Sequence, residues 1–251
     1  MARVGIFDSG AGGLSVLREI RRAAPGLECI YYADNANCPY GDKSAEFIIG
    51  RSRAITGELL GRGADAIVVA CNTATAAAIA TLREEYPLVP FVGMEPAVKP
   101  AALGTRSGVV GVLATAGTLK ASKYLDTKGR FEADVQIVER VGRAFVELVE
   151  RGVLDGEEVE KAVHEAVDPL LEQGADTIVL GCTHYPFLRG VIERVCGPSV
   201  RIIDPAPAVA RRLVEVLSEA GVPLECAAAG DVTLLASGDT RVLRKLLIAC
   251  S

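Results

Sequence analysis

The sequence has only two histidines, His164 and His184, and its seven cysteines form no Cys-x-x-Cys pair. Zinc ribbons and thioredoxin-type motifs need such pairs, so neither is supported. The scarcity of histidine limits a metal site further. No lysine stands at a predicted strand end, which argues against pyridoxal phosphate. We therefore expect that the protein needs neither a metal nor a cofactor.

Long hydrophobic segments and an excess of basic residues are also missing. The longest apolar runs have about the length of a strand and are interrupted by charges, so no membrane span is expected. The first residues enter a strand pattern directly and contain no signal-peptide core, which predicts a cytoplasmic protein. A net charge of −5 offers no basic surface for nucleic acid. The composition, with 50% apolar residues, is that of a globular protein, and a chain of 251 residues usually forms one or two domains.

One stretch occurs twice and organises the chain. Residues 63–75 read GADAIVVACNTAT and residues 174–185 read GADTIVLGCTHY, so Cys71 and Cys182 match at an offset of 111 residues (182 − 71). Each copy is an apolar, β-branched run followed by a cysteine and a helix-like segment, which is typical of a buried parallel strand. Ligands bind just outside the carboxyl ends of such strands. Each half is therefore predicted to offer one thiol to a shared site.

A second pair of segments supports the repeat. A strand expected over residues 3–7 runs into Asp8-Ser9 and a glycine-rich loop, and Thr115 follows Ser9 by 106 residues (115 − 9) after a similar strand. A helix after a glycine loop is a ready anion site, and a plain strand-to-helix turn is an equal alternative. The loop over residues 33–42 is read either as functional or as a solvated turn with Tyr40 packed on the surface.

The remaining patterns place the other elements. Further strands are expected over 28–32, 66–70, 88–92, 108–113, 133–138, 177–180, 200–203 and 232–237. Helices are expected over 14–22, from Asp42 or Ser44 to about 62, and over 73–85, 157–171, 208–220 and 239–248, with Pro169 kinking or ending its helix. The simplest architecture is an α/β fold of two pseudo-symmetric α/β domains with mostly parallel sheets and the active site in the cleft between them. The first domain would comprise residues 1–97 and 206–251, and the second 98–205.

The cysteines differ in what their surroundings predict. Free cysteine usually behaves as a small buried hydrophobe, and this interpretation is accepted for Cys29, Cys196, Cys226 and Cys250. Cys38, beside a proline in a loop, is ambiguous. Cys71 and Cys182 stand at strand ends before helix starts, where a helix N-terminus lowers the thiol pKa from about 8.5 and favours the thiolate.

Two opposed thiols suit a two-base racemase, which removes a proton from one face of a carbon and adds one to the other. Proton transfer is efficient when the pKa of the catalytic group lies near the working pH. His184 is placed to polarise the thiol of Cys182 or to bind a substrate carboxylate, and Asp8 to assist Cys71. The alternatives are a satisfied polar residue at a strand end for His184 and a helix cap for Asp8. His164 lies on the polar face of its helix and is interpreted as solvated.

At these residues the chain resembles the glutamate racemases, the cofactor-independent racemases of bacterial cell-wall synthesis. The matching motifs occur in the family's order over most of the chain. They are Phe7-Asp8-Ser9-Gly10, Gly12-Gly13-Leu14-Ser15-Val16-Leu17, Pro39-Tyr40-Gly41, Ala70-Cys71-Asn72-Thr73-Ala74, Glu95-Pro96-Ala97 and Gly181-Cys182-Thr183-His184-Tyr185-Pro186.

The resemblance implies a role for each matching residue. Cys71 and Cys182 would be the acid/base pair, each serving one enantiomer, and Asp8 and His184 would assist them. The residues implied to surround glutamate are Asp8, Ser9, Tyr40, Gly41, Asn72, Thr73, Thr183 and His184. Glu150 maps to a further implicated glutamate. The family implies two pseudo-symmetric domains with the site between them, D-glutamate for peptidoglycan as the product, and a possible homodimer.

Two departures from the family pattern and several rival functions stay open. Arg143-Ala144 stands where the family often has Cys-Pro, and Asn37 where it often has arginine. The rivals are an aspartate or other amino-acid racemase of the same superfamily, a two-lobed amino-acid-binding module, and a Cys–His hydrolase that uses Cys182 and His184. The hydrolase leaves Cys71 without a role.

Overall fold

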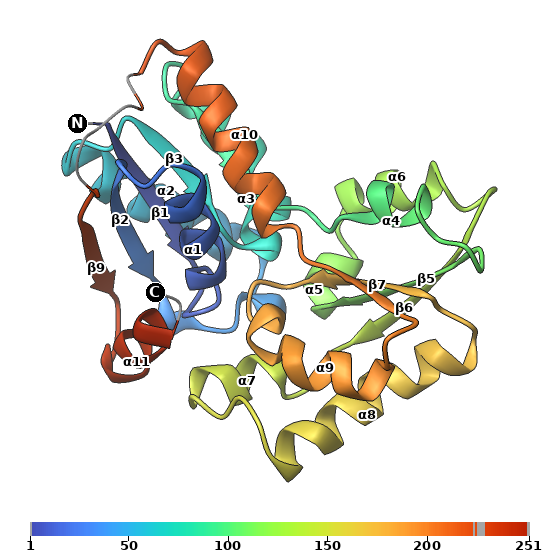
Figure 1. The fold of residues 1–251 in the computed structure, drawn as a ribbon. Coiled ribbons are helices and arrows are strands. Elements are labelled where there is room, and N and C mark those ends of the chain that lie inside the picture. Colours follow the sequence, from blue (N-terminus) through green and yellow to red (C-terminus); the bar gives the residue numbers. More distant parts are fainter. Residues whose placement is uncertain (1, 223, 225–228, 250–251) are drawn as a thin grey trace.

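The chain folds around two parallel β-sheets that lie side by side in the computed structural model (Figure 1). The structure describes residues 2–222, 224 and 229–249. Cys226 and Cys250, interpreted from the sequence as small hydrophobes, lie outside these residues. Within them, no helix is both long and apolar enough to cross a membrane.

The first sheet has five strands in the order β4-β3-β1-β2-β9, all paired in parallel. Its strands are β1 (Arg3–Asp8), β2 (Glu28–Ala33), β3 (Ala66–Val69), β4 (Phe91–Gly93) and β9 (Val232–Ala236). β1 and β3 are buried apart from Arg3, as expected for central parallel strands that helices cover on both faces. The strand β9, from the C-terminal part of the chain, therefore joins the sheet that contains the N-terminal strand β1.

The second sheet has four strands in the order β6-β5-β7-β8, again all parallel. Its strands are β5 (Val109–Ala114), β6 (Gln136–Val141), β7 (Thr177–Gly181) and β8 (Arg201–Ile203). In this sheet β5, β6, β7 and β8 hold the positions that β1, β2, β3 and β4 hold in the first sheet. The predicted α/β class with parallel sheets is confirmed, and the shared strand order supports the repeat read from the sequence. The domain boundaries at 97/98 and 205/206 stay a prediction.

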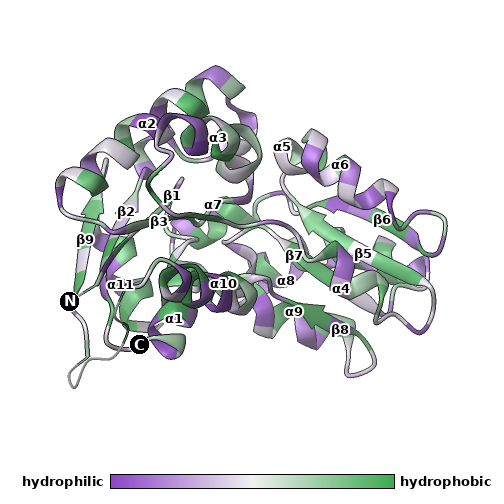
Figure 2. Cartoon of the chain, turned by 90° about the horizontal axis from the view of Figure 1, so that it is seen from above, coloured by the Kyte–Doolittle hydropathy of each residue, from purple (hydrophilic) through white to green (hydrophobic). Residues whose placement is uncertain are grey.

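Helices pack on both sheets and present mixed hydropathy, while the strands they cover are mostly apolar (Figure 2). The α-helices are α1 (Leu14–Ala23), α2 (Ala45–Gly61), α3 (Asn72–Glu85), α4 (Val98–Ala102), α5 (Ala116–Leu119), α6 (Ser122–Gly129), α7 (Phe145–Glu150), α8 (Glu157–Glu172), α9 (Arg189–Cys196), α10 (Ala206–Glu219) and α11 (Arg241–Ala249). The described residues also form the short 3₁₀ turns η1 (Asn35–Asn37), η2 (Tyr40–Asp42) and η3 (Tyr185–Leu188). Asp42 and Ser44 were the two caps expected for α2. Ser44 is the cap, since its side chain accepts a hydrogen bond from the Phe47 amide.

Three expectations about element boundaries are wrong. The strand expected over 88–92 is β4, and Leu88 is 95% exposed because it lies in a turn between two prolines. The strand expected over 133–138 begins at Gln136, since a hydrogen-bonded turn around Phe131 occupies the preceding residues. Of the two outcomes expected at Pro169, an end of the helix is wrong, since α8 continues to Glu172, and a kink stays a prediction. The buried Leu170 that follows holds this last turn against the core, and a proline removes only one backbone donor there.

Ala144 precedes α7 in a left-handed conformation (φ 64°), which costs an L-residue with a Cβ about 1–2 kcal/mol. Replacing Ala144 by glycine is therefore expected to raise the free energy of unfolding by about 1 kcal/mol, after glycine's extra chain entropy is subtracted. Urea denaturation measures this change. Ala121, which precedes α6 with φ −70°, is the matched control, and Ala121→Gly should lower stability slightly. A loss of stability in Ala144→Gly would contradict the strain argument.

Candidate active site

Cys71 and Cys182 occupy equivalent places in the two sheets. Cys71 lies two residues after the end of β3 and caps the N-terminus of α3, and Cys182 directly follows β7. The two thiols are nearly buried, 5% and 7% exposed, and both line one small cavity. Because β3 and β7 hold the same position in their sheets, the repeat brings one cysteine from each half to a common space.

The cavity between the thiols is lined by every residue predicted to surround a substrate except Asp8. Its walls are Ser9, Pro39, Tyr40, Gly41, Cys71, Asn72, Thr73, Thr115, Thr118, Val146, Gly181, Cys182, Thr183 and His184. Its free volume is about 10 Å³, close to the minimum for one water. A cavity of about 450 Å³ shares Pro39, Gly41, Thr115 and Val146 with it. An amino acid therefore enters only if these walls move apart, and the larger cavity marks an entrance.

Five of the cavity's residues were not predicted to belong to the site, namely Pro39, Thr115, Thr118, Val146 and Gly181. Thr115 and Thr118, at the start of α5, form a hydroxyl cluster with Thr73 of α3, with Oγ1–Oγ1 distances of 3.0–3.3 Å. The cluster joins the two halves across the site. Thr115 carried a signal, since it matches Ser9 in the repeat, whereas Thr118 carried none.

Asn72 is the clearest sign that the cavity receives a polar ligand. Its side chain is buried, and neither its amide nitrogen nor its amide oxygen has a hydrogen-bond partner. A buried unsatisfied amide costs about 1–3 kcal/mol, so native proteins rarely keep one without a reason. An amino-acid carboxylate or ammonium in the cavity would give Asn72 the missing partner.

The surroundings of Cys71 do not favour its thiolate in the ligand-free protein. Its Sγ accepts a hydrogen bond from the Ala74 amide at 3.5 Å and donates one to Ser9 Oγ at 3.8 Å. Burial and the nearby charge of Asp8 outweigh the amide and raise the pKa of Cys71. The expectation of a lowered thiol pKa at this helix start is therefore wrong, because the helix N-terminus supplies one weak donor to a fully buried group.

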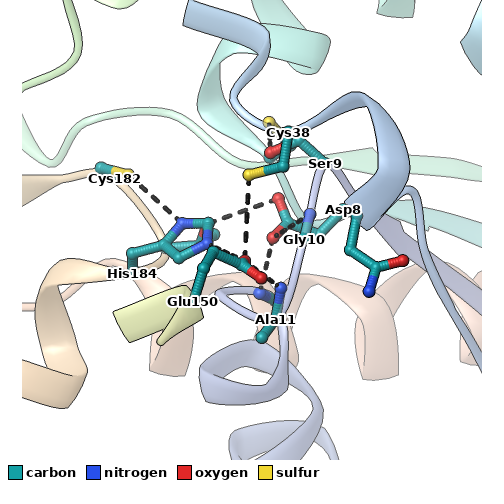
Figure 3. A network of polar contacts seen from close by, with 12 residues as sticks. Asp8, Ser9, Gly10, Ala11, Cys38, Glu150, Cys182 and His184 are labelled. Atoms are coloured by element: carbon teal, nitrogen blue, oxygen red, sulfur yellow. Dashed lines mark hydrogen bonds and ion pairs between the residues drawn. The ribbon is translucent and has the colours of Figure 1, made fainter. Parts of the chain in front are cut away.

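His184 connects Cys182 to Glu150 (Figure 3). Its Nδ1 lies 3.7 Å from Cys182 Sγ, and its Nε2 lies 2.6 Å from Glu150 Oε1. Burial alone would lower the pKa of His184, but hydrogen bonds to Cys182, Cys38 and Glu150 outweigh burial and raise it. Burial would likewise raise the pKa of Glu150, and the hydrogen bond and charge of His184 lower it instead. A protonated imidazole beside an ionised carboxylate is thus the favoured state, and it can stabilise a thiolate on Cys182.

The glycine-rich loop after β1 is part of this network. Glu150 Oε1 also accepts a hydrogen bond from the Ala11 amide at 2.6 Å. A Cβ on Gly10 would overlap the Glu150 carboxylate, and one on Gly12 would overlap the His184 ring. The loop therefore needs glycine where it passes beneath the two side chains, which favours the functional interpretation over a plain turn.

Asp8 caps the glycine-rich loop and also lies beside Cys71. Its carboxylate accepts hydrogen bonds from the Gly13 amide at 2.9 Å and the Gly10 amide at 3.3 Å, which is a cap of the loop. It also contacts the Cys71 thiol and accepts from Thr183 Oγ1 at 3.4 Å. Burial raises the pKa of Asp8 and the charge of His184 offsets part of the rise. Asp8 thus lies between the Cys71 side and the Cys182 side of the site.

Tyr40 is buried rather than packed on the surface, because a salt bridge beneath it holds the loop. Its hydroxyl donates to Asp34 Oδ2 at 2.6 Å, and Arg51 donates two hydrogen bonds to the same carboxylate. Burial would raise the pKa of Asp34, but these hydrogen bonds lower it. His164, in contrast, is exposed, and its ring contacts Asp168 on the same helix, as expected for a solvated residue.

The comparisons with known proteins agree with this geometry. The family profile described as Asp/Glu/Hydantoin racemase matches residues 4–213. The glutamate racemase of Stutzerimonas stutzeri is 49% identical over 98% of this chain and 92% of its own. That of Pseudomonas aeruginosa PAO1 is 53% identical over 86% and 82%. The crystal structure of Escherichia coli glutamate racemase with L-glutamate and the activator UDP-MurNAc-Ala superposes with a TM-score of 0.88 at 38% identity, covering 100% of this chain and 95% of that one.

Proposed function

This chain belongs to the Asp/Glu/Hydantoin racemase family, and from this premise we propose that it is a glutamate racemase that interconverts L- and D-glutamate by proton transfer between two cysteines. The observation that carries the mechanism is the single cavity lined by Cys71 and Cys182 from equivalent strand ends. Supply of D-glutamate for peptidoglycan, a cytoplasmic location and a homodimer are further parts of the proposal. The names of the relatives favour glutamate over aspartate.

In each turnover one cysteine is a thiolate and the other a thiol. The thiolate takes the α-proton, so that an S–H bond forms while the C–H electron pair stays on the α-carbon. The other thiol then gives its proton to the opposite face and becomes a thiolate. The product is the other enantiomer, and the two sulfurs have exchanged protonation states. In these states the sulfurs are ready for the reverse reaction, and exchange of protons with solvent resets them for another turnover in the same direction.

The remaining side chains bind the substrate and control charge. The unpartnered Asn72 amide and the Thr73 and Thr183 hydroxyls are placed to hold carboxylate and ammonium groups. The ammonium of the substrate brings a positive charge beside the buried Cys71, which favours the thiolate that burial otherwise disfavours. On the other side, the raised pKa of His184 keeps a cation beside Cys182. Fixed polar groups aimed at the α-carbanion lower the barrier.

Purified protein with L-glutamate alone, followed by circular dichroism in deuterated buffer, tests the proposal. We expect the ellipticity to decay to zero and deuterium to enter the α-position, with a chelator present and no pyridoxal phosphate added. A constant signal without exchange would support the binding module instead. Faster racemisation of aspartate would support the rival racemase, and release of ammonia or another hydrolysis product would support the Cys–His hydrolase.

A further inference from the structure

Cys38 places a third sulfur beside the active-site network without a role in the proton transfer. It lies in the loop between β2 and α2, whereas Glu150 ends α7 and His184 follows β7. Cys38 Sγ donates to Glu150 Oε1 at 3.9 Å, and the same oxygen is 2.6 Å from His184 Nε2. The three ligand atoms lie within 4.8 Å of one another, and Figure 3 shows the side chains converging from separate segments.

A thiol, an imidazole and a carboxylate form a donor set that Zn²⁺ prefers. Bond lengths of about 2.0–2.3 Å in a tetrahedral site place neighbouring ligand atoms roughly 3.3–3.7 Å apart. The observed Sγ–Oε1 distance of 3.9 Å is already close to that spacing. The Nε2–Oε1 distance of 2.6 Å must open by less than about 1 Å, since the shared proton that now holds it would be replaced by the ion.

The cluster borders a cavity of about 500 Å³ through Glu150, which lines it together with Ala11, residues of η1 and residues of α11. Glu150 is the one ligand of the three in its wall, which also holds the basic side chains of Arg241 and Lys245. Water from this cavity is the fourth ligand of the proposed site, which has three protein ligands and one open position.

We propose that Cys38, Glu150 and His184 form a Zn²⁺ site whose occupation inhibits the enzyme. The ion replaces two protons, one on Cys38 Sγ and one on His184 Nε2, and both leave to solvent. The Cys38 thiolate and the Glu150 carboxylate offset the two charges of the ion, and His184 becomes a neutral ligand that is fixed in place. The imidazolium that stabilises negative charge on Cys182 is then lost, so proton transfer slows in both directions. Glu150 also loses its hydrogen bond to His184 and is drawn away from the Ala11 amide.

The test compares wild type, Cys38→Ser and Cys196→Ser. Cys38→Ser keeps a hydroxyl donor for Glu150 but removes the sulfur ligand, and Cys196 is a buried cysteine on α9 away from the site. We expect ZnCl₂ to inhibit wild type and Cys196→Ser alike and MgCl₂ to inhibit neither. Cys38→Ser should remain active and need at least about 10-fold more zinc, since disturbing even an outer-shell partner costs 10–100-fold in affinity.

Binding is measured independently of activity with Co²⁺ and by thermal unfolding. Wild type should develop a thiolate-to-cobalt absorption band and gain thermal stability with Zn²⁺, and Cys38→Ser should lose both. Equal zinc sensitivity in Cys38→Ser would overturn the proposal and place the ion on Cys182 and His184. The absence of a cobalt band in wild type would overturn it as well. The inhibition rests on the proposed function, whereas the cobalt band does not, so a site without racemase activity would refute only that function.

Discussion

Serine in place of Cys71, or of Cys182, is expected to abolish racemisation in both directions, with kcat falling at least about 10³-fold. A serine hydroxyl keeps the size and the hydrogen bonds of the site. Its pKa is far above that of a thiol, so it neither holds a proton-accepting anion nor gives up a proton readily. Because one turnover uses both sulfurs, neither loss is compensated by the other cysteine. Polarimetry with each enantiomer as the substrate measures the loss.

The two variants are further expected to differ in isotope exchange, which separates lost chemistry from lost folding. The remaining cysteine still faces the α-proton of one enantiomer, and a proton taken up on sulfur exchanges with solvent. In deuterated buffer each variant should therefore label one enantiomer without inverting it, and the two should label opposite ones. Cys29→Ser is the control, since this buried cysteine on β2 contacts the Leu27 carbonyl and lies outside the cavity. Turnover within about 10-fold of wild type in either variant would refute the two-thiol mechanism.

The fold was largely predictable because its signal is local and occurs twice. The runs before Cys71 and Cys182 are apolar and β-branched, and each is followed by a helix start. This pattern predicts a strand, its burial and its parallel direction in the sheet. The return of β9 to the first sheet was also expected, as part of the simplest two-domain architecture. Boundaries failed where competing turns decided them, as around Phe131 and Leu88. The short helices α4, α5, α6 and α7 were not predicted, since segments of four to eight residues show too few helical repeats.

Only those site residues could be predicted that have a reactive or polar side chain and stand at the end of a predicted strand. Cys71 and Cys182 lie just after strands, Asp8 ends one, and the topology of the parallel sheets brings all three together. The bond from Glu150 to His184 joins residues 34 apart on separate elements, and Cys38 joins Glu150 across 112 residues. Such contacts depend on how the two halves pack against each other. The raised pKa of Cys71 was likewise not predictable, since it follows from burial and from the charge of Asp8 rather than from the helix start.

Glu150→Gln is expected to lower kcat about 100-fold, the lower end of what groups that assist proton transfer contribute. Glutamine keeps an oxygen for the Ala11 amide and fills the same space beneath Cys38, so the loop retains its shape. What it removes is the negative charge 2.6 Å from His184 Nε2. That charge helps to raise the pKa of His184, and its loss makes the imidazolium beside Cys182 less stable. Glu150 acts through His184 and is a positioning residue rather than a catalytic one.

The pH profile distinguishes this role from a merely structural one. With the carboxylate gone, the pKa of His184 falls toward its ordinary value of about 6.5, so the basic limb of kcat/KM should move to lower pH. At a pH below that limb His184 is protonated in both proteins, and the variant should recover part of its activity there. Glu147→Gln, which removes an exposed charge from the same helix, is the matched control and should leave the profile unchanged. A uniform loss of rate at every pH would show that Glu150 acts by holding the loop at Ala11 and not by stabilising the positive charge on His184.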